Sequence, residues 1–118
     1  MDGADGYFGW VRVGGRKYVK DVIVHVDGSV TERPTELSLD YRSDYFHTPL
    51  SERELGFLDG ERPEVVIVGA GYKSMMPLTP QAKAVLERYD LVVRSTSDAI
   101  EIMNRESRRF VAILHLTC

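Results

Sequence analysis

The sequence predicts an α/β protein in which antiparallel strands come first and an α-β-α-β-α-β order follows. Three observations support this class. The first third of the chain holds short runs of β-branched and aromatic residues separated by turn signals. Residues 65–68, Val-Val-Ile-Val, form an apolar run typical of a strand covered on both faces. Thr79 followed by Pro80 is typical of a helix start.

The N-terminal part predicts a meander of three antiparallel strands. The first strand is expected over residues 7–13 and the second over residues 17–26. Gly14-Gly15 between them is a tight turn. Asp27-Gly28 is a strong two-residue hairpin signal, so the chain is expected to return in a short strand over residues 29–32.

Residues 33–47, RPTELSLDYRSDYFH, are the least regular part of the sequence. A loop of this length in a small protein is often functional or mobile. Its aromatic side chains therefore have two interpretations, a lid over the core or a contact surface for a partner. The candidate partner-binding residues are Tyr41, Tyr45, Phe46 and His47.

From residue 48 onward the pattern indicates helices that alternate with strands. Ser51 and Glu54 have the spacing of a capping box, and Gly60 is placed to end the helix that follows. After the strand over residues 65–68, Thr79 caps a second helix with Pro80 at its first position. The apolar residues of this second helix recur at helical spacing: Ala82, Val85, Leu86 and Tyr89.

The last quarter of the chain completes the alternation. A strand is expected over residues 91–93 and a third helix near residues 97–106. Ala99, Ile100 and Met103 would face inward from that helix. A final strand is expected over residues 110–116.

Length and composition predict a single domain over residues 1–118. The net charge is -3, with acidic and basic residues mixed along the chain, so nucleic acid is not an expected partner. Cys118 is the one cysteine, which favours a reducing, cytoplasmic location. No signal peptide is evident, and the apolar runs are too short for membrane insertion.

Gly69-Ala70-Gly71 follows the buried strand and resembles the start of a nucleotide site. The dinucleotide fingerprint, however, needs the helix to begin inside the loop, and here it begins about eight residues late, at Thr79. No acidic residue ends the next strand, and no Gly-Lys-Ser/Thr follows the glycines. The pattern therefore does not favour NAD, FAD or ATP.

A small-anion pocket is the functional interpretation that remains for this loop. Ligands of open α/β sheets bind beyond the carboxyl ends of parallel strands. If the strands at residues 65–68 and 91–93 are neighbours, their following loops meet. The candidate ligand-binding residues are Gly69, Gly71, Lys73, Ser74, Arg94 and Thr96. The alternative is structural: the glycines make a turn, Lys73 is solvated, and Thr96 or Ser97 caps the third helix.

Other chemistry has little support in the sequence. The three histidines, His25, His47 and His115, lie on separate elements, so no metal site is expected. His25 and His115 sit in strands, where a hydrogen-bonded core or edge histidine is usual. His115 and Cys118 would lie on opposite faces of the last strand, so they do not form a nucleophile pair by themselves.

Five stretches together resemble a family of small single-domain proteins of archaea and bacteria. They are HVDGSVTERPTELS, HTPLSERELGFL, VVIVGAG, VVRSTSDAIEIMN and RRFVAILHLTC. Eukaryotic relatives in that family include an adipogenesis-associated protein and mitochondrial complex I assembly factor three. The resemblance spans nearly the whole chain, is strongest to archaeal members, and includes Thr96, Asn104 and the ending His115-x-Thr117-Cys118.

The resemblance implies a three-layer fold around a mixed central sheet flanked by helices. It also implies that the final strand runs antiparallel to the helix-linked strands. It implies no established enzyme activity, and so no catalytic residues, and no known cofactor, and it favours binding over catalysis. Two functions therefore stay open: a non-catalytic binding or assembly module, which could be a homodimer, and a small-molecule or anion-binding protein, which could be an enzyme, with its site at Gly69–Ser74 and Thr96.

Overall fold

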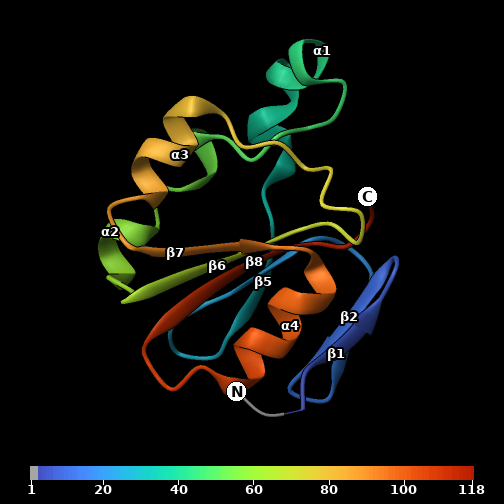
Figure 1. The fold of residues 1–118 in the computed structure, drawn as a ribbon, viewed down its shortest axis with the longest axis vertical. Coiled ribbons are helices and arrows are strands. Elements are labelled where there is room, and N and C mark those ends of the chain that lie inside the picture. The colour runs from blue at the N-terminus through green and yellow to red at the C-terminus, as the bar shows by residue number, and fades with distance from the viewer. Residues whose placement is uncertain (1–2) are drawn as a thin grey trace.

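The computed structural model describes residues 3–118 and contains two sheets (Figure 1). The smaller sheet is antiparallel and has the order β1-β2-β3. Its strands are β1 (Asp5–Tyr7), β2 (Trp10–Val13) and β3 (Arg16–Tyr18). Gly14 and Gly15 have φ angles of 60° and 81°. These positive values fit the tight hairpin turn that the sequence predicts between β2 and β3.

The larger sheet has five strands in the order β5-β4-β8-β6-β7. The strands are β4 (Val22–Val24), β5 (Val30–Glu32), β6 (Val65–Ala70), β7 (Asp90–Arg94) and β8 (Phe110–His115). β6 and β7 are parallel, whereas β4 and β5 form an antiparallel hairpin. The sheet is therefore mixed, as the resemblance implies.

The expected direction of the last strand is wrong. β8 runs parallel to β6, with Ile67 opposite Ala112, and antiparallel to β4 instead. A helical crossover connects β7 to β8, and crossovers of this kind return the chain to the same end of the sheet. β8 thus joins the parallel half of the sheet to the antiparallel hairpin.

Two expected N-terminal strands are each split in the structure. The segment 7–13 turns at residues 8–9, so that β1 and β2 form a hairpin with Tyr7 opposite Trp10. The segment 17–26 breaks at residues 19–21, after which the chain leaves the small sheet for β4. The second break is where the chain passes from the smaller sheet to the larger one.

Two longer helices and several short turns connect the strands. They are η1 (Thr35–Tyr41), α1 (Arg42–Tyr45), η2 (Glu52–Glu54), α2 (Leu58–Glu61), α3 (Pro80–Leu86) and α4 (Thr96–Arg105). Thr79 Oγ1 accepts from the Ala82 N–H at 3.1 Å, so the expected cap of α3 is confirmed. Within residues 3–118, none of the helices has both the length and the apolar character required to cross a bilayer.

The helix expected after Ser51 is replaced by two short turns, η2 and α2. Ser51 makes no capping hydrogen bond, and the side chain of Glu54 points into a buried ion pair instead. Gly60 lies inside α2 rather than after it, and Arg62 ends that helix in a left-handed conformation with φ 48°. Ser51 and Glu54 therefore have the spacing of a capping box but do not form one.

Three layers enclose two apolar cores, one on each face of the larger sheet (Figure 1). α2 and α3 cover one face, and α4 with the small sheet covers the other. β6 contributes to both cores, because Val66 and Val68 point to the α3 side and Val65 and Ile67 to the α4 side. The expectation that this strand is covered on both faces is confirmed.

Candidate functional site

Thr96, the first residue of α4, holds the glycine loop that follows β6. The Gly71 N–H donates to Thr96 Oγ1 at 2.9 Å, and the Thr96 N–H donates to the Gly71 carbonyl at 3.0 Å. The Thr96 hydroxyl in turn donates to the His115 carbonyl at 2.5 Å. Thr96 is fully buried. Its side chain is therefore a structural clamp between the β6 loop, β8 and the start of α4.

The last residues of the sequence lie directly on the same loop. The Tyr72 N–H donates to the Thr117 carbonyl at 2.7 Å, and the N–H groups of Lys73 and Met75 donate to the Cys118 carbonyl at 3.0 and 2.9 Å. These three backbone donors are the ones that an anion in the loop would use. Residues 117–118 already engage them, so the loop in this conformation offers them to no ligand.

Gly71 is the residue that permits this close approach. Its φ is 101°, and a Cβ built on it would lie 2.0 Å from the Cys118 carbonyl carbon. A side chain at this position therefore needs the final residues to move. The glycine that looked like part of a nucleotide loop makes room for another part of the same chain.

The remaining candidates of the anion pocket are only partly brought together. Gly69 lies opposite Arg94 in the β6–β7 ladder, so the strands are neighbours as the anion-pocket hypothesis requires. The Arg94 guanidinium donates to the Val93 carbonyl at 2.8 Å, however, rather than to a group of the glycine loop. Lys73 and Ser74 are exposed. Ser95, not Thr96 or Ser97, accepts the capping hydrogen bond of α4.

A cavity of about 360 Å³ lies beside Lys73. Its lining residues are Gly6, Tyr7, Phe8, Tyr72, Lys73 and Ser97. The rings of Tyr7 and Phe8 are tilted against the ring of Tyr72, with centroid distances of 5.9 and 6.3 Å. The Tyr72 hydroxyl is buried without a hydrogen-bond partner within residues 3–118, and burial raises the pKa of Tyr72. The cavity thus combines aromatic walls with one cationic side chain.

Residues 35–47, here called the protruding segment, stand away from the sheet and carry α1 (Figure 1). Phe46 is 87% exposed and ends α1 with φ 61°. Leu37 and Leu39 are exposed as well. Tyr41, by contrast, is held down: its hydroxyl donates to Glu52 at 3.0 Å, and the Arg53 guanidinium lies 4.8 Å from its ring centroid.

Tyr45 and His47 are half-buried, so the four aromatic candidates of this segment divide into two groups. Phe46 presents its ring to solvent, whereas Tyr41, Tyr45 and His47 contribute mainly to the body of the segment. The interpretation of these aromatics as a lid over the core does not fit Phe46.

A buried ion pair anchors the protruding segment. Arg33 Nε lies 2.6 Å from Glu54 Oε1, and Arg33 Nη2 donates to Glu54 Oε2 at 2.9 Å. The Ser38 hydroxyl from η1 donates to the same carboxylate at 2.5 Å. Both charged side chains are almost fully buried. Burial alone would lower the pKa of Arg33, but Glu54 and then Asp21 outweigh it and raise the pKa.

Asp21 extends this polar network to β8. Its Oδ2 lies 3.0 Å from Arg33 Nη1 and 2.7 Å from His115 Nδ1, and its Oδ1 accepts from the Leu116 N–H at 2.9 Å. Burial opposes ionisation of Asp21, but the hydrogen bond and charge of His115, the Leu116 N–H and Arg33 together lower its pKa. Sequence reasoning missed this network, because its members are far apart along the chain.

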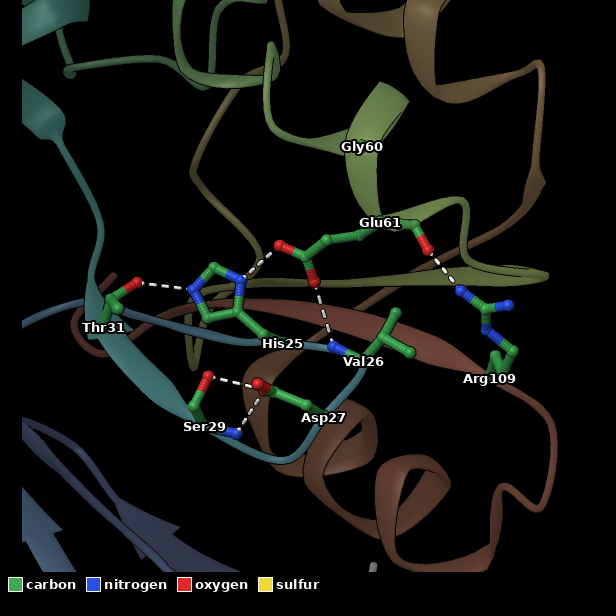
Figure 2. Close-up of a pocket in the computed structure, with 8 residues that line it drawn as sticks. All are labelled: His25, Val26, Asp27, Ser29, Thr31, Gly60, Glu61 and Arg109. Atoms are coloured by element: carbon green, nitrogen blue, oxygen red, sulfur yellow. Dashed lines mark hydrogen bonds and ion pairs between the residues drawn. The ribbon is translucent and has the colours of Figure 1, made fainter.

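A second cavity, of about 410 Å³, lies where the β4–β5 turn meets α2 (Figure 2). His25 is at its centre: Nδ1 lies 2.6 Å from Glu61 Oε2, and Nε2 lies 2.7 Å from Thr31 Oγ1. Since an ionised carboxylate only accepts, Nδ1 donates to Glu61, and in a neutral imidazole Nε2 is then the nitrogen that accepts from the threonine hydroxyl. Arg109 donates to the Glu61 carbonyl from the other side of the cavity (Figure 2).

The order carboxylate, imidazole, hydroxyl is the one by which a general base activates a nucleophile. Acyl transfer also needs backbone donors for the oxyanion. The nearby N–H groups of Val26, Gly28 and Ser29 are engaged by Glu61 Oε1, the His25 carbonyl and Asp27 Oδ1. These three donors are therefore already used, and His25, hydrogen bonded as expected, links Glu61 of α2 to Thr31 of β5.

No group of three or more His, Cys, Asp or Glu side chains in the described part of the chain is arranged to hold a metal ion.

Among curated proteins, none matches the chain. Solved structures do. A conserved hypothetical protein from Pyrococcus horikoshii OT3 has 25% identity and a TM-score of 0.86, with 98% of this chain and 99% of that chain covered.

Two further solved structures show how widely the fold is shared. A protein named MT938 has 38% identity and a TM-score of 0.79, over 97% of this chain and 96% of that one. An outer membrane protein from Bartonella henselae has 17% identity and a TM-score of 0.64, over 98% and 94% of the two chains, and supports the fold alone. A family model of proteins of unknown function matches residues 5–115. The chain belongs to this family, DUF498/DUF598.

Proposed function

We propose that this protein is a non-catalytic binding or assembly module that contacts a protein partner through the protruding segment. The observation that carries this proposal is the exposure of Phe46, at 87%, on a segment that a buried ion pair fixes to the body of the protein. Aromatic side chains, phenylalanine among them, are enriched at protein interfaces relative to the rest of the surface.

The support matters as much as the exposure. Arg33, Glu54 and Ser38 hold the base of the segment, and the Tyr41–Arg53 contact holds its middle. A partner would therefore meet a preorganised surface and lose little conformational entropy on ordering it. The resemblance to a family that has an assembly factor among its eukaryotic relatives agrees with this kind of role.

The test begins with photo-crosslinking. A benzophenone amino acid is placed at position 46 and, as a matched control, at Phe8, another exposed aromatic position on the far hairpin. Both proteins are crosslinked in a lysate of the native host, and the captured proteins are compared by mass spectrometry. The proposal requires a protein captured from position 46 and not from position 8.

The captured protein is then purified, and its affinity is measured by calorimetry. Phe46→Asp should weaken binding at least tenfold, whereas Phe8→Asp should leave it unchanged. Equal affinities for wild type and Phe46→Asp, in variants that melt at the same temperature, would refute a role for this segment.

A second candidate is a small-molecule site at the strand ends, in the cavity beside Lys73. The three aromatic rings and the lysine favour a planar ligand with a negative charge, such as an aromatic carboxylate. Binding of benzoate can be measured from the NMR chemical shifts of the Tyr72 and Lys73 amides. It should weaken in Lys73→Ala and stay unchanged in Lys83→Ala, a control at an exposed position of α3. Unshifted amides, or equal binding by both variants, would exclude it.

A further inference from the structure

β7 is an edge strand whose outer side has main-chain groups available for pairing. In the larger sheet it pairs with β6 alone. The Asp90 N–H donates to the Glu64 carbonyl, so Asp90 directs its main-chain groups toward β6. Because successive residues of a strand alternate in this direction, Val92 and Arg94 do the same, and Leu91 and Val93 direct theirs outward.

The sequence of β7, Asp-Leu-Val-Val-Arg, is complementary to itself when read in the opposite direction. An antiparallel pair of β7 strands centred on Val92 places Asp90 of each copy opposite Arg94 of the other. It also places Leu91 of each copy opposite Val93 of the other. The main-chain groups of both residues point outward, so the two residues form a hydrogen-bonded pair of the antiparallel ladder. Charge pattern and main-chain direction therefore select the same register.

We propose that the β7 edge binds the β7 edge of a second copy of this chain, in antiparallel register about Val92. Two Leu91–Val93 pairs would then exchange about four main-chain hydrogen bonds. Asp90, whose Oδ2 also lies 2.9 Å from Arg108 Nη1 within each copy, would meet Arg94 of the other copy. Two such ion pairs would form at the ends of the ladder, where side chains of a non-hydrogen-bonded pair lie close together. The two five-stranded sheets become one continuous sheet across a two-fold axis.

The surface beside β7 extends this contact. A depression of about 260 Å³ on the α4 side is lined by Val92, Ile102, Arg105, Glu106 and Arg108. Val92 and Ile102 are half-buried, so apolar surface lies at the centre with charges around it. Such an apolar centre with a polar rim is typical of protein interfaces. On the two-fold axis, the depression of one copy faces that of the other.

β7 fits this role better than β5, the opposite edge of the same sheet. β5 has three residues, Val-Thr-Glu, and its one charged side chain has no opposite charge on the strand. β7 has five residues without proline or glycine. Natural edge strands are usually protected from pairing, and β7 lacks the common means of protection apart from its terminal charges.

Arg94 gives the proposal a clear competitor. Its guanidinium caps the outward carbonyl of Val93 at 2.8 Å, as an edge-protecting side chain would. If Arg94 guards the edge, Arg94→Glu removes the guard and self-association increases. If Arg94 pairs with the second copy's Asp90, Arg94→Glu places two acidic residues opposite each other and self-association decreases.

The experiment is sedimentation velocity at high micromolar concentration on the full chain. Wild type should be dimeric, and Lys83→Glu, a charge reversal on α3, should remain so. Arg94→Glu and Asp90→Arg should each be monomeric with unchanged circular dichroism. Mixed in equal amounts, these two variants should form a heterodimer, because each ion pair then joins opposite charges.

The double variant Asp90→Arg/Arg94→Glu should recover the homodimer. A monomeric wild type, a dimer unaffected by either reversal, or a mixture that stays monomeric would each overturn the proposal. These outcomes are independent of Phe46, so failure here leaves the partner-binding function of the protruding segment untouched, and the reverse holds as well.

Discussion

Replacing Gly71 by alanine should destabilise the protein strongly, because two separate costs meet at this position. The backbone has φ 101°, which an L-residue adopts with difficulty. The new Cβ would also lie 2.0 Å from the carbonyl carbon of Cys118, far inside contact distance. The final residues must therefore move away from the loop.

The magnitude follows from these contacts. The positive φ costs about 1–2 kcal/mol. Displacing residues 117–118 weakens three hydrogen bonds, from the N–H groups of Tyr72, Lys73 and Met75, each worth about 0.5–1.5 kcal/mol. If half of that contribution is lost, the total is about 3 kcal/mol. For 118 residues the unfolding entropy is about 0.25 kcal/mol per degree, so Tm should fall by about 12 °C.

Two control variants separate the contributions. Gly14 has φ 60°, and a Cβ added there would meet nothing within 4 Å, so Gly14→Ala reports the backbone cost alone. Gly60 also has nothing within 4 Å and lies inside α2, so Gly60→Ala should be neutral or stabilising by about 0.5–1 kcal/mol. Thermal unfolding followed by circular dichroism measures all three. A Tm for Gly71→Ala within about 2–3 °C of that for Gly14→Ala, a difference of less than about 0.8 kcal/mol, would refute the proposed contact.

Three other perturbations test the buried groups. Glu54→Gln should lower the unfolding free energy by about 1.5–3 kcal/mol in urea, since Arg33 loses a charged hydrogen-bond acceptor and keeps Asp21 as its ion-pair partner. Asp40→Asn, in an exposed ion pair, should change it by less than about 1 kcal/mol. Folding holds the pKa of Asp21 below 3.8, so its stabilisation is present above that pH and is lost as pH falls through the folded pKa. The unfolding free energy of Asp21→Asn, measured by urea titration, should therefore fall less on acidification than that of the wild type. Ile67→Asp should abolish soluble expression, and a soluble variant with wild-type Tm would contradict the burial of β6.

The sequence predicts the second half of the fold well because local signals and tertiary environment agree there. Thr79 with Pro80 sets the start of α3, and the apolar run of β6 fits a strand buried on both faces. The direction of β8 has no local signal. It depends on which strand β8 pairs with, and pairing is decided by contacts far apart in the chain.

The site was harder to predict for the same reason. Gly71 satisfies the composition of a phosphate loop, but the acceptors for the N–H groups that follow it are the carbonyls of Thr117 and Cys118, which are distant in sequence. Glu54 reads as the end of a capping box, although its carboxylate pairs with Arg33. Local spacing identifies residues that are able to make an interaction. The fold determines which partner lies close enough to make it.

The central place of β8 also constrains how the protein folds. The hairpin β4–β5 and the pair β6–β7 share no ladder, and β8 alone joins them. Neither half can complete the sheet until β8 pairs with both β4 and β6, so one edge of the apolar strand β6 stays unpaired until β8 joins it. Pairings so distant in sequence slow folding. The chain therefore passes through a stage in which its most buried strand is its most aggregation-prone one.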